Sequence, residues 1–209
     1  MLKYILLEND SILIEGRRLY RIKALRDIEI PLKLNNYTKK IKKGALGGYI
    51  ASYNNLSQED NSWVYEGAMV YDNARVMNNS VVESASIICG NAVVSSTVFT
   101  KSLRSPHLGA VIRDYAEVVD SYIGVKAIVG GRAKVYNTII CTYTDYLKVY
   151  ANSKVSNSNI RAKGDIYGNA EINQCVITGN IDISGNARAY NSKLSSVILS
   201  SNENIMNSK

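Results

Sequence analysis

A six-residue repeat constrains this chain more than any other feature of its sequence. A small residue, Ala or Ser, is followed two places later by an aliphatic residue, and the pair recurs without a gap from residue 62 to residue 94. Helices repeat apolar residues every three or four places and half-buried strands alternate them, so neither explains a sustained period of six. Short strands joined by tight corners do explain it. The pairs are Ser62–Val64, Ala68–Val70, Ala74–Val76, Ser80–Val82, Ser86–Ile88 and Ala92–Val94, and later ones include Ala116–Val118, Ala133–Val135, Ser153–Val155 and Ala170–Ile172.

This repeat predicts an all-β parallel solenoid in which each coil has three flat walls. Each aliphatic side chain would point to the axis, and each small residue would lie inside a corner. Three six-residue walls give a coil of 18 residues, and one five-residue wall shortens the coil to 17. The shorter coil explains why DIYGNAE at Asp165 returns as DISGNAR at Asp182, because Gly and Asn tolerate the positive φ that a corner needs. We expect about seven coils, stacked at about 4.8 Å.

The repeat also divides the chain into regions. Residues 1–50 are predicted to form an N-terminal cap, with a β-hairpin over 3–25 followed by a polar, Lys-rich connection. Residues 51–200 form the solenoid, and 201–209 a C-terminal tail. Two coils carry insertions. With Phe99 as a wall residue and Val118 as the start of the coil after Val94, both insertions project from the same corner of the shaft, two coils apart.

Charge and composition limit the setting. The net charge is +7, and residues 1–50 carry most of it, with 11 Lys/Arg against 5 Asp/Glu. No run approaches the roughly 20 apolar residues of a membrane span, and the N-terminal apolar run is too short for a signal peptide. Three cysteines without metal-ligand spacing favour a reduced, cytoplasmic compartment, with no metal site and no membrane partner.

The period-six residues resemble the hexapeptide-repeat family of left-handed parallel β-helices. A closer likeness covers Leu19 to about Val76, where the phrases KKGALGGYI and NLSQEDNSWVY are similar to those of poorly characterised bacterial and phage or prophage proteins. Those proteins have an N-terminal hairpin cap and are often labelled transferases because of the repeat. The resemblance implies a left-handed coil and a homo-oligomer, but a shared fold does not fix an activity.

His107 is the only histidine and the one candidate catalytic residue. Transferases of the hexapeptide-repeat type often use a histidine as general base at a cleft between subunits. Lys101 and Arg104 precede it, and a basic loop suits an anionic donor such as acyl-coenzyme A. The alternative is an exposed loop histidine with no catalytic role, since no carboxylate is placed to orient it. No other cofactor is implied.

Two groups of residues are candidates for binding. The insertions combine tyrosine with charge, a composition typical of interaction hot spots, and the N-terminal basic residues could meet nucleic acid or an acidic protein. Each group could instead be an ordinary solvated surface. The loop-edge candidates are Lys101, Arg104, Tyr143, Asp145, Tyr146 and Lys148, and the basic-cap candidates are Arg17, Arg18, Lys39, Lys40, Lys42 and Lys43.

Three functions therefore stay open. The first is a non-enzymatic binding or scaffold protein, phage-encoded and directed at a host, that presents the basic cap and the loop edge to a protein or nucleic acid. The second is an acyl- or acetyltransferase that uses His107. The third is a self-assembling structural element.

Overall fold

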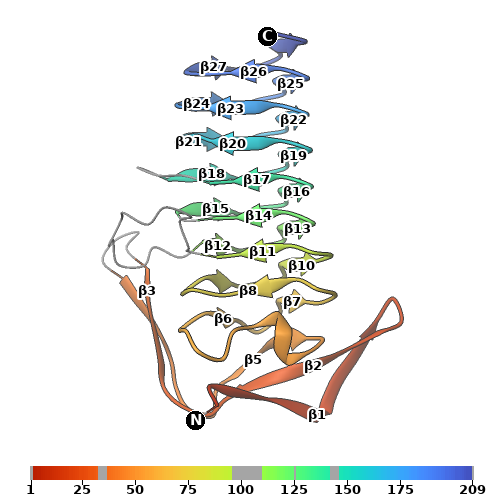
Figure 1. Ribbon diagram of the computed structural model, residues 1–209, viewed down its shortest axis with the longest axis vertical. Coiled ribbons are helices and arrows are strands. Elements are labelled where there is room, and N and C mark those ends of the chain that lie inside the picture. The colour runs from red at the N-terminus through yellow and green to blue at the C-terminus, as the bar shows by residue number, and fades with distance from the viewer. Residues whose placement is uncertain (1, 33–36, 96–109, 125, 142–145, 209) are drawn as a thin grey trace.

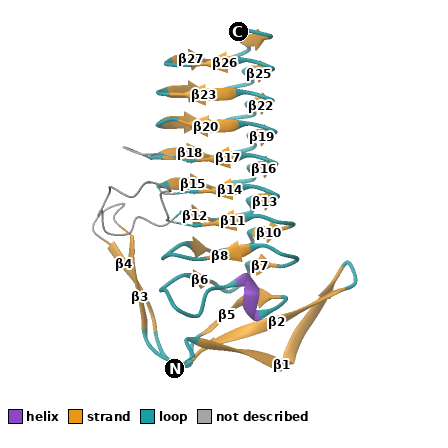
Figure 2. Ribbon diagram, in the orientation of Figure 1, coloured by secondary structure: helices purple, strands orange, loops and turns teal. Residues whose placement is uncertain are grey.

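Parallel β-strands wind into a β-solenoid of about 8 turns, as the sequence predicts (Figures 1 and 2). The computed structural model describes residues 2–32, 37–95, 110–124, 126–141 and 146–208. The N-terminal strands lie across one end of the shaft, and the C-terminal rung lies at the other.

Three sheets form the walls of the shaft, named here in the order in which the chain visits them. Wall 1 contains β5 (Leu46–Ile50), β7 (Met69–Val70), β10 (Ile87–Cys89), β13 (Glu117–Val119), β16 (Lys134–Tyr136), β19 (Lys154–Ser156), β22 (Glu171–Asn173), β25 (Arg188–Tyr190) and β28 (Asn204–Met206). Wall 2 contains β8 (Arg75–Val76), β11 (Val93–Val94), β14 (Tyr122–Ile123), β17 (Ile139–Ile140), β20 (Asn159–Arg161), β23 (Val176–Thr178) and β26 (Lys193–Leu194). Wall 3 contains β6 (Trp63–Val64), β9 (Val81–Val82), β12 (Val111–Ile112), β15 (Ala127–Val129), β18 (Leu147–Val149), β21 (Gly164–Ile166), β24 (Ile181–Ile183) and β27 (Val197–Leu199).

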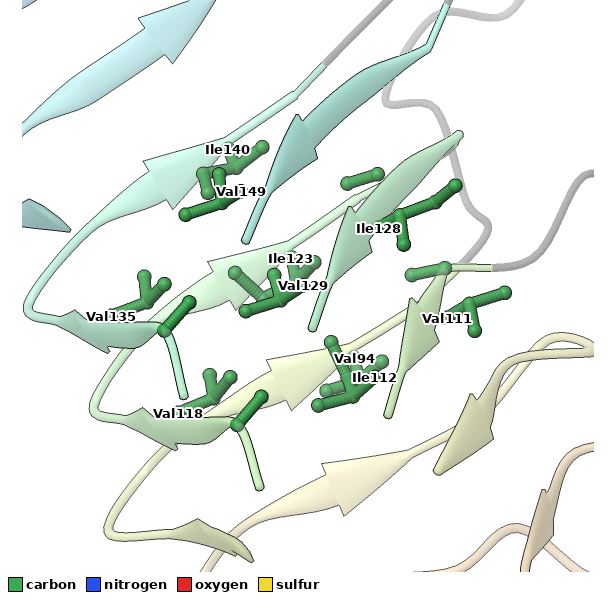
Figure 3. Packing of buried hydrophobic residues seen from close by; sticks show 14 of the residues in the cluster. Val94, Val111, Ile112, Val118, Ile123, Ile128, Val129, Val135, Ile140 and Val149 are labelled. Atoms are coloured by element: carbon green, nitrogen blue, oxygen red, sulfur yellow. The ribbon is translucent and has the colours of Figure 1, made fainter. Parts of the chain in front are cut away.

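One inward aliphatic side chain per wall recurs in every coil, and it is branched except at Ala189 in β25. Val118 and Val135 stack along wall 1, Ile123 and Ile140 along wall 2, and each is fully buried (Figure 3). The small residues of the repeat are buried as well. Because no coil can bury its inner surface alone, the stability of the shaft depends on contacts between neighbouring coils.

Amide side chains tie successive coils together at the corner between walls 3 and 1. Asn152 donates to Asn169 (3.1 Å) and Asn169 donates to Asn186 (2.9 Å). The glycines that precede the last two, Gly168 and Gly185, have φ of +75° and +66°. The two copies of the DI-x-GNA phrase therefore form the same corner of consecutive coils, as the 17-residue period predicts.

A second column of side chains fills the corner between walls 1 and 2. Each member donates to a carbonyl two residues earlier and accepts the N–H of the next member, as from Thr138 N to Ser121 Oγ (3.1 Å) and from Cys175 N to Ser158 Oγ (3.1 Å). Cys175 holds this position with a thiol, which donates to Asn173 O and accepts the N–H of Ser192. Burial raises the pKa of that thiol.

The N-terminal cap extends wall 1 with antiparallel strands. β1 (Tyr4–Ile14) and β2 (Arg17–Ala24) form the predicted hairpin, and β2 pairs with β5. The edge of β5 is thereby covered, and the 11-residue β1 becomes the edge strand of this sheet.

The predicted Lys-rich connection is instead a second hairpin. β3 (Ile28–Leu32) pairs antiparallel with β4 (Tyr37–Ile41), and the hairpin rises beside wall 3 (Figure 1). Ile28, Ile30 and Ile41 are buried. The hairpin alternates buried isoleucine with charged residues, which is the pattern of a strand with one face against a core.

The two insertions lie at the same corner, as the sequence predicts, but the register around the first one differs and Phe99 lies outside the described residues. Ile123, not Val118, stacks on Val94, and Val118 stacks on Ile88. Both insertions lie between walls 2 and 3, before β12 and β18, which are separated by β15 alone. The shaft also continues to β28, past the expected boundary at residue 200.

The thiol in the second column provides a test of that column. Cys175→Ser keeps both hydrogen bonds and should leave the free energy of unfolding within about 1 kcal/mol of wild type. Cys175→Ala leaves the N–H of Ser192 unpaired, while Asn173 O keeps the N–H of Asn191 (3.1 Å), and should cost about 1–3 kcal/mol. Urea unfolding of the two variants measures the difference, and an alanine variant as stable as the serine variant would contradict the role assigned to this column.

Candidate interaction surfaces

The phrase NLSQEDNSW joins the cap to the first coil. Gln58 acts as a clamp on β1, since its Oε1 accepts the N–H groups of Lys3 (2.8 Å) and Tyr4 (3.3 Å) and its Nε2 donates to Tyr4 O (3.1 Å). Asn55 is fully buried and donates to Ala74 O (2.8 Å) in the next coil. These residues hold the N-terminal strand on the shaft, so their role is structural.

The phrase LGGYI is structural for a different reason. A Cβ on Gly48 would lie 2.3 Å from Ala68 O, and one on Gly47 would lie 2.6 Å from Val64 O. Only glycine lets β5 pass this close to the first coil. The two phrases that carry the resemblance thus fix the cap on the solenoid.

Lys3 is the most unusual titratable group at this junction. Its side chain is fully buried, and Nζ donates to Ser62 O (2.8 Å) and lies 3.6 Å from Asp60 Oδ1. Burial lowers the pKa of Lys3 to about 8, against the opposing attraction of Asp60. Burial also disfavours the Asp60 carboxylate, but the N–H and hydroxyl of Ser62, the N–H of Asn78 and the charge of Lys3 outweigh it and hold the pKa of Asp60 below its usual value.

The predicted basic cap forms ion pairs with nearby carboxylates. Lys39 pairs with Glu83 and lies over the ring of Tyr65, 4.6 Å from its centroid. Lys40 lies 3.2 Å from Glu29, and Lys42 lies 3.0 Å from Asp27.

The arginines of β2 are also held by neighbours. Arg17 pairs with Asp72 and Glu15. Arg18 donates to Ser11 Oγ (3.1 Å), and at Lys43 the backbone N–H donates to Asp27 (2.8 Å). Two of these carboxylates, Asp72 and Glu83, come from the first coils, outside residues 1–50, so the charge of the N-terminal segment alone overestimates the positive field of this surface.

The loop edge is only partly described. Lys101, Arg104, His107, Tyr143 and Asp145 lie outside the described residues. Tyr146 is partly buried and packs against the core. Lys148 is on the outer face of wall 3, 3.9 Å from Asp165.

The described residues hold few features of an enzyme site. No group of three or more His, Cys, Asp or Glu among them could hold a metal ion. Burial raises the pKa of the Cys89 thiol, as it does that of Cys175, and a raised pKa disfavours the thiolate that a nucleophile needs. Over the same part of the chain, no helix has the length and apolar character needed to cross a membrane.

Comparison with known proteins adds no assignment. No family model matches the chain, and no curated protein matches it.

The buried pair at the junction predicts a specific pattern of stability. Asp60→Asn leaves a buried ammonium without its counter-charge and should cost about 3–5 kcal/mol. Lys3→Met should cost less, because Asp60 keeps its hydrogen bonds from Ser62 and Asn78. The double variant should recover part of the loss, and equal, additive losses would contradict coupling of the two residues.

The same pair predicts a pH dependence. Between pH 8 and about 10.5 the unfolded chain keeps a proton on Lys3 that the folded chain has released, so this group raises the free energy of unfolding as pH rises. The stability of wild type relative to Lys3→Met should therefore increase by about 1–3 kcal/mol from pH 8 to pH 10. Urea unfolding across this range measures the increase, and a difference that stays constant with pH would contradict the lowered pKa.

Proposed function

We propose that this chain is a non-enzymatic binding protein whose rigid shaft presents the loop edge to a macromolecular partner. The observation that carries the proposal is the position of the two insertions. Both interrupt the passage from wall 2 to wall 3, and β12 and β18 lie two rungs apart, about 10 Å along the shaft. Insertions that cluster on a rigid scaffold are a common way to build a binding surface.

The proposed partner of the loop edge is a protein, and the basic cap is a poor surface for a nucleic acid. Binding of a nucleic acid depends on unpaired positive charge, whereas Lys39, Lys40, Lys42 and Arg17 form ion pairs within the chain. The residue types of the insertions, tyrosine with arginine and lysine, suit a protein interface. The proposal keeps the finer features that the resemblance implies, namely a left-handed coil, a phage or prophage protein directed at a host, and a homo-oligomer, and it keeps the cytoplasmic setting that the cysteines favour.

An affinity experiment tests this function. The full chain is immobilised, and proteins captured from a lysate of the source cells are identified by mass spectrometry at low and high salt after nuclease treatment. The triple variant Lys101→Ala/Arg104→Ala/His107→Ala should lose the partner at least tenfold, because it removes side chains of the first insertion. Lys154→Gln, on the outer face of wall 1, is the matched control and should capture the partner as wild type does.

Two outcomes would overturn the proposal. One is a partner that the triple variant captures as well as the control does. The other is turnover of acyl-coenzyme A that is lost in His107→Ala alone, which would favour the transferase. Capture that disappears after nuclease treatment, and that the variant Lys40→Gln/Lys42→Gln/Lys43→Gln weakens, would instead assign a nucleic-acid partner to the basic cap.

A further inference from the structure

A shallow groove runs along the shaft beside the corner between walls 1 and 2. Two hollows form it, and they share Asn137 and Ile139, so the groove is continuous from Asn91 to Asn191. It passes over the outer face of wall 2 from β11 to β23. Since it crosses five rungs, it is about 24 Å long.

One side of the groove is a column of exposed amides, formed by Asn137, Asn157, Gln174 and Asn191. All four have positive φ, between 46° and 53°, so they occupy the same place in successive corners. In the part of the chain that the structure describes, their side-chain amides make no hydrogen bond. The amides from Asn152 to Asn202 at the other corner, by contrast, bond one to the next along the shaft.

The floor of the groove is apolar with one unsatisfied acceptor. Ile139 and Val176 are 46% and 47% exposed, which leaves branched side chains open to water on a flat sheet. Asn159 lies between them, and its Oδ1 is buried without a hydrogen-bond partner. An unsatisfied acceptor of this kind costs about 1–3 kcal/mol, so a ligand that brought a donor to it, after a rotation about χ2, would gain affinity.

Charge distinguishes this groove from the other walls. The outer face of wall 1 carries paired charges, such as Lys134 with Glu117 (3.1 Å) and Lys154 with Glu171 (3.6 Å). The lining of the groove carries a single charge, Asp120 at its N-terminal end, whose carboxylate already accepts the N–H of Asn91 (2.8 Å). The complementary ligand is therefore uncharged, with groups that both donate and accept hydrogen bonds and with an apolar side.

We infer that the groove binds an uncharged, extended oligosaccharide of β-linked hexose units. A sugar hydroxyl donates and accepts, as an amide does, and the C–H faces of the ring would cover Ile139 and Val176. One ring of an extended chain is about as long as one rung, so each unit would meet one amide of the column.

Two other occupants fit less well. Residues on one face of an extended peptide recur every 6.6 Å or so, out of step with rungs about 4.8 Å apart. If two copies of this chain met through the groove, two concave surfaces would face each other and would not be complementary in shape. A strip this narrow also falls short of the roughly 800 Å² per partner of a stable interface.

Isothermal titration of the full chain with cellohexaose and with the fully N-acetylated chitohexaose, both neutral and β-linked, tests the inference. At least one of them should bind with a dissociation constant of about 0.1–1 mM, and the β-linked hexamer of deacetylated glucosamine, which is charged, should bind at least tenfold more weakly. The variant Asn157→Gly/Gln174→Gly removes two amides where glycine adopts the same positive φ without strain, and it should weaken binding at least tenfold. Asn169→Ala, at the other corner, is the matched control and should bind as wild type does.

Other results would overturn the inference. If neither neutral hexamer binds at millimolar concentration, or if the double glycine variant binds as the control does, the groove is not a sugar site. If sedimentation shows that Val176→Lys converts an oligomer of the wild-type chain to a monomer, the groove is an interface between copies. Each of these results leaves the proposed protein partner of the loop edge untouched, because the edge and the groove lie on different corners.

Discussion

Backbone hydrogen bonds between coils are the interaction on which the rest of this structure depends. A strand of two or three residues has no partner within its own coil, so its N–H and C=O groups are satisfied only by the coils on either side. Met69 donates to Ser86 O, and Ile87 in turn donates to Ala116 O, at 2.9 Å each. Every coil must therefore place its residues in register with both neighbours, and the inward aliphatic residues fix that register because a one-residue slip would turn them to water.

This constraint explains which parts of the fold the sequence predicts. The inward positions repeat because the interior is the same in every coil. The period and the residue sizes therefore predict the three walls, the burial of Val135 and Ile172, and the corner at Gly168. The first insertion breaks the period, and nothing local shows where it begins. The prediction that Phe99 is a wall residue assigns Val118 to the wrong wall, and the pairing of Val94 with Ile123 gives the correct register.

The second hairpin could be predicted from the outward-facing residues of wall 3, which are not part of the inward repeat. Outward positions of wall 3 are apolar in the first coils, at Trp63, Val81, Val111 and Ile128, and all four are buried. Figure 3 shows Val111 and Ile128 on the side of their strands opposite to Ile112 and Val129. Higher on the same wall the outward residues are charged, at Lys148 and Asp182. An apolar outer face on an otherwise polar wall indicates that another element covers it, and the hairpin of β3 and β4 stands beside its lower rungs (Figure 1).

The outward positions are also where a solenoid can carry function, because the inward ones are fixed by packing. On the first coils of wall 3 they pack under other parts of the chain, and on wall 1 they form cross-strand ion pairs that satisfy one another. Wall 2 and its corner differ, since Ile139 and Val176 are open to water and, within the described residues, the side-chain amides of Asn137, Asn157, Gln174 and Asn191 make no hydrogen bond. Amides bond from rung to rung at the other corner, from Asn152 to Asn202, and at the N-terminal end of this one, where Asn73 donates to Asn91. The four amides of this column are exposed and do not bond to one another, and together with the exposed apolar residues beside them they favour a ligand on this side of the shaft.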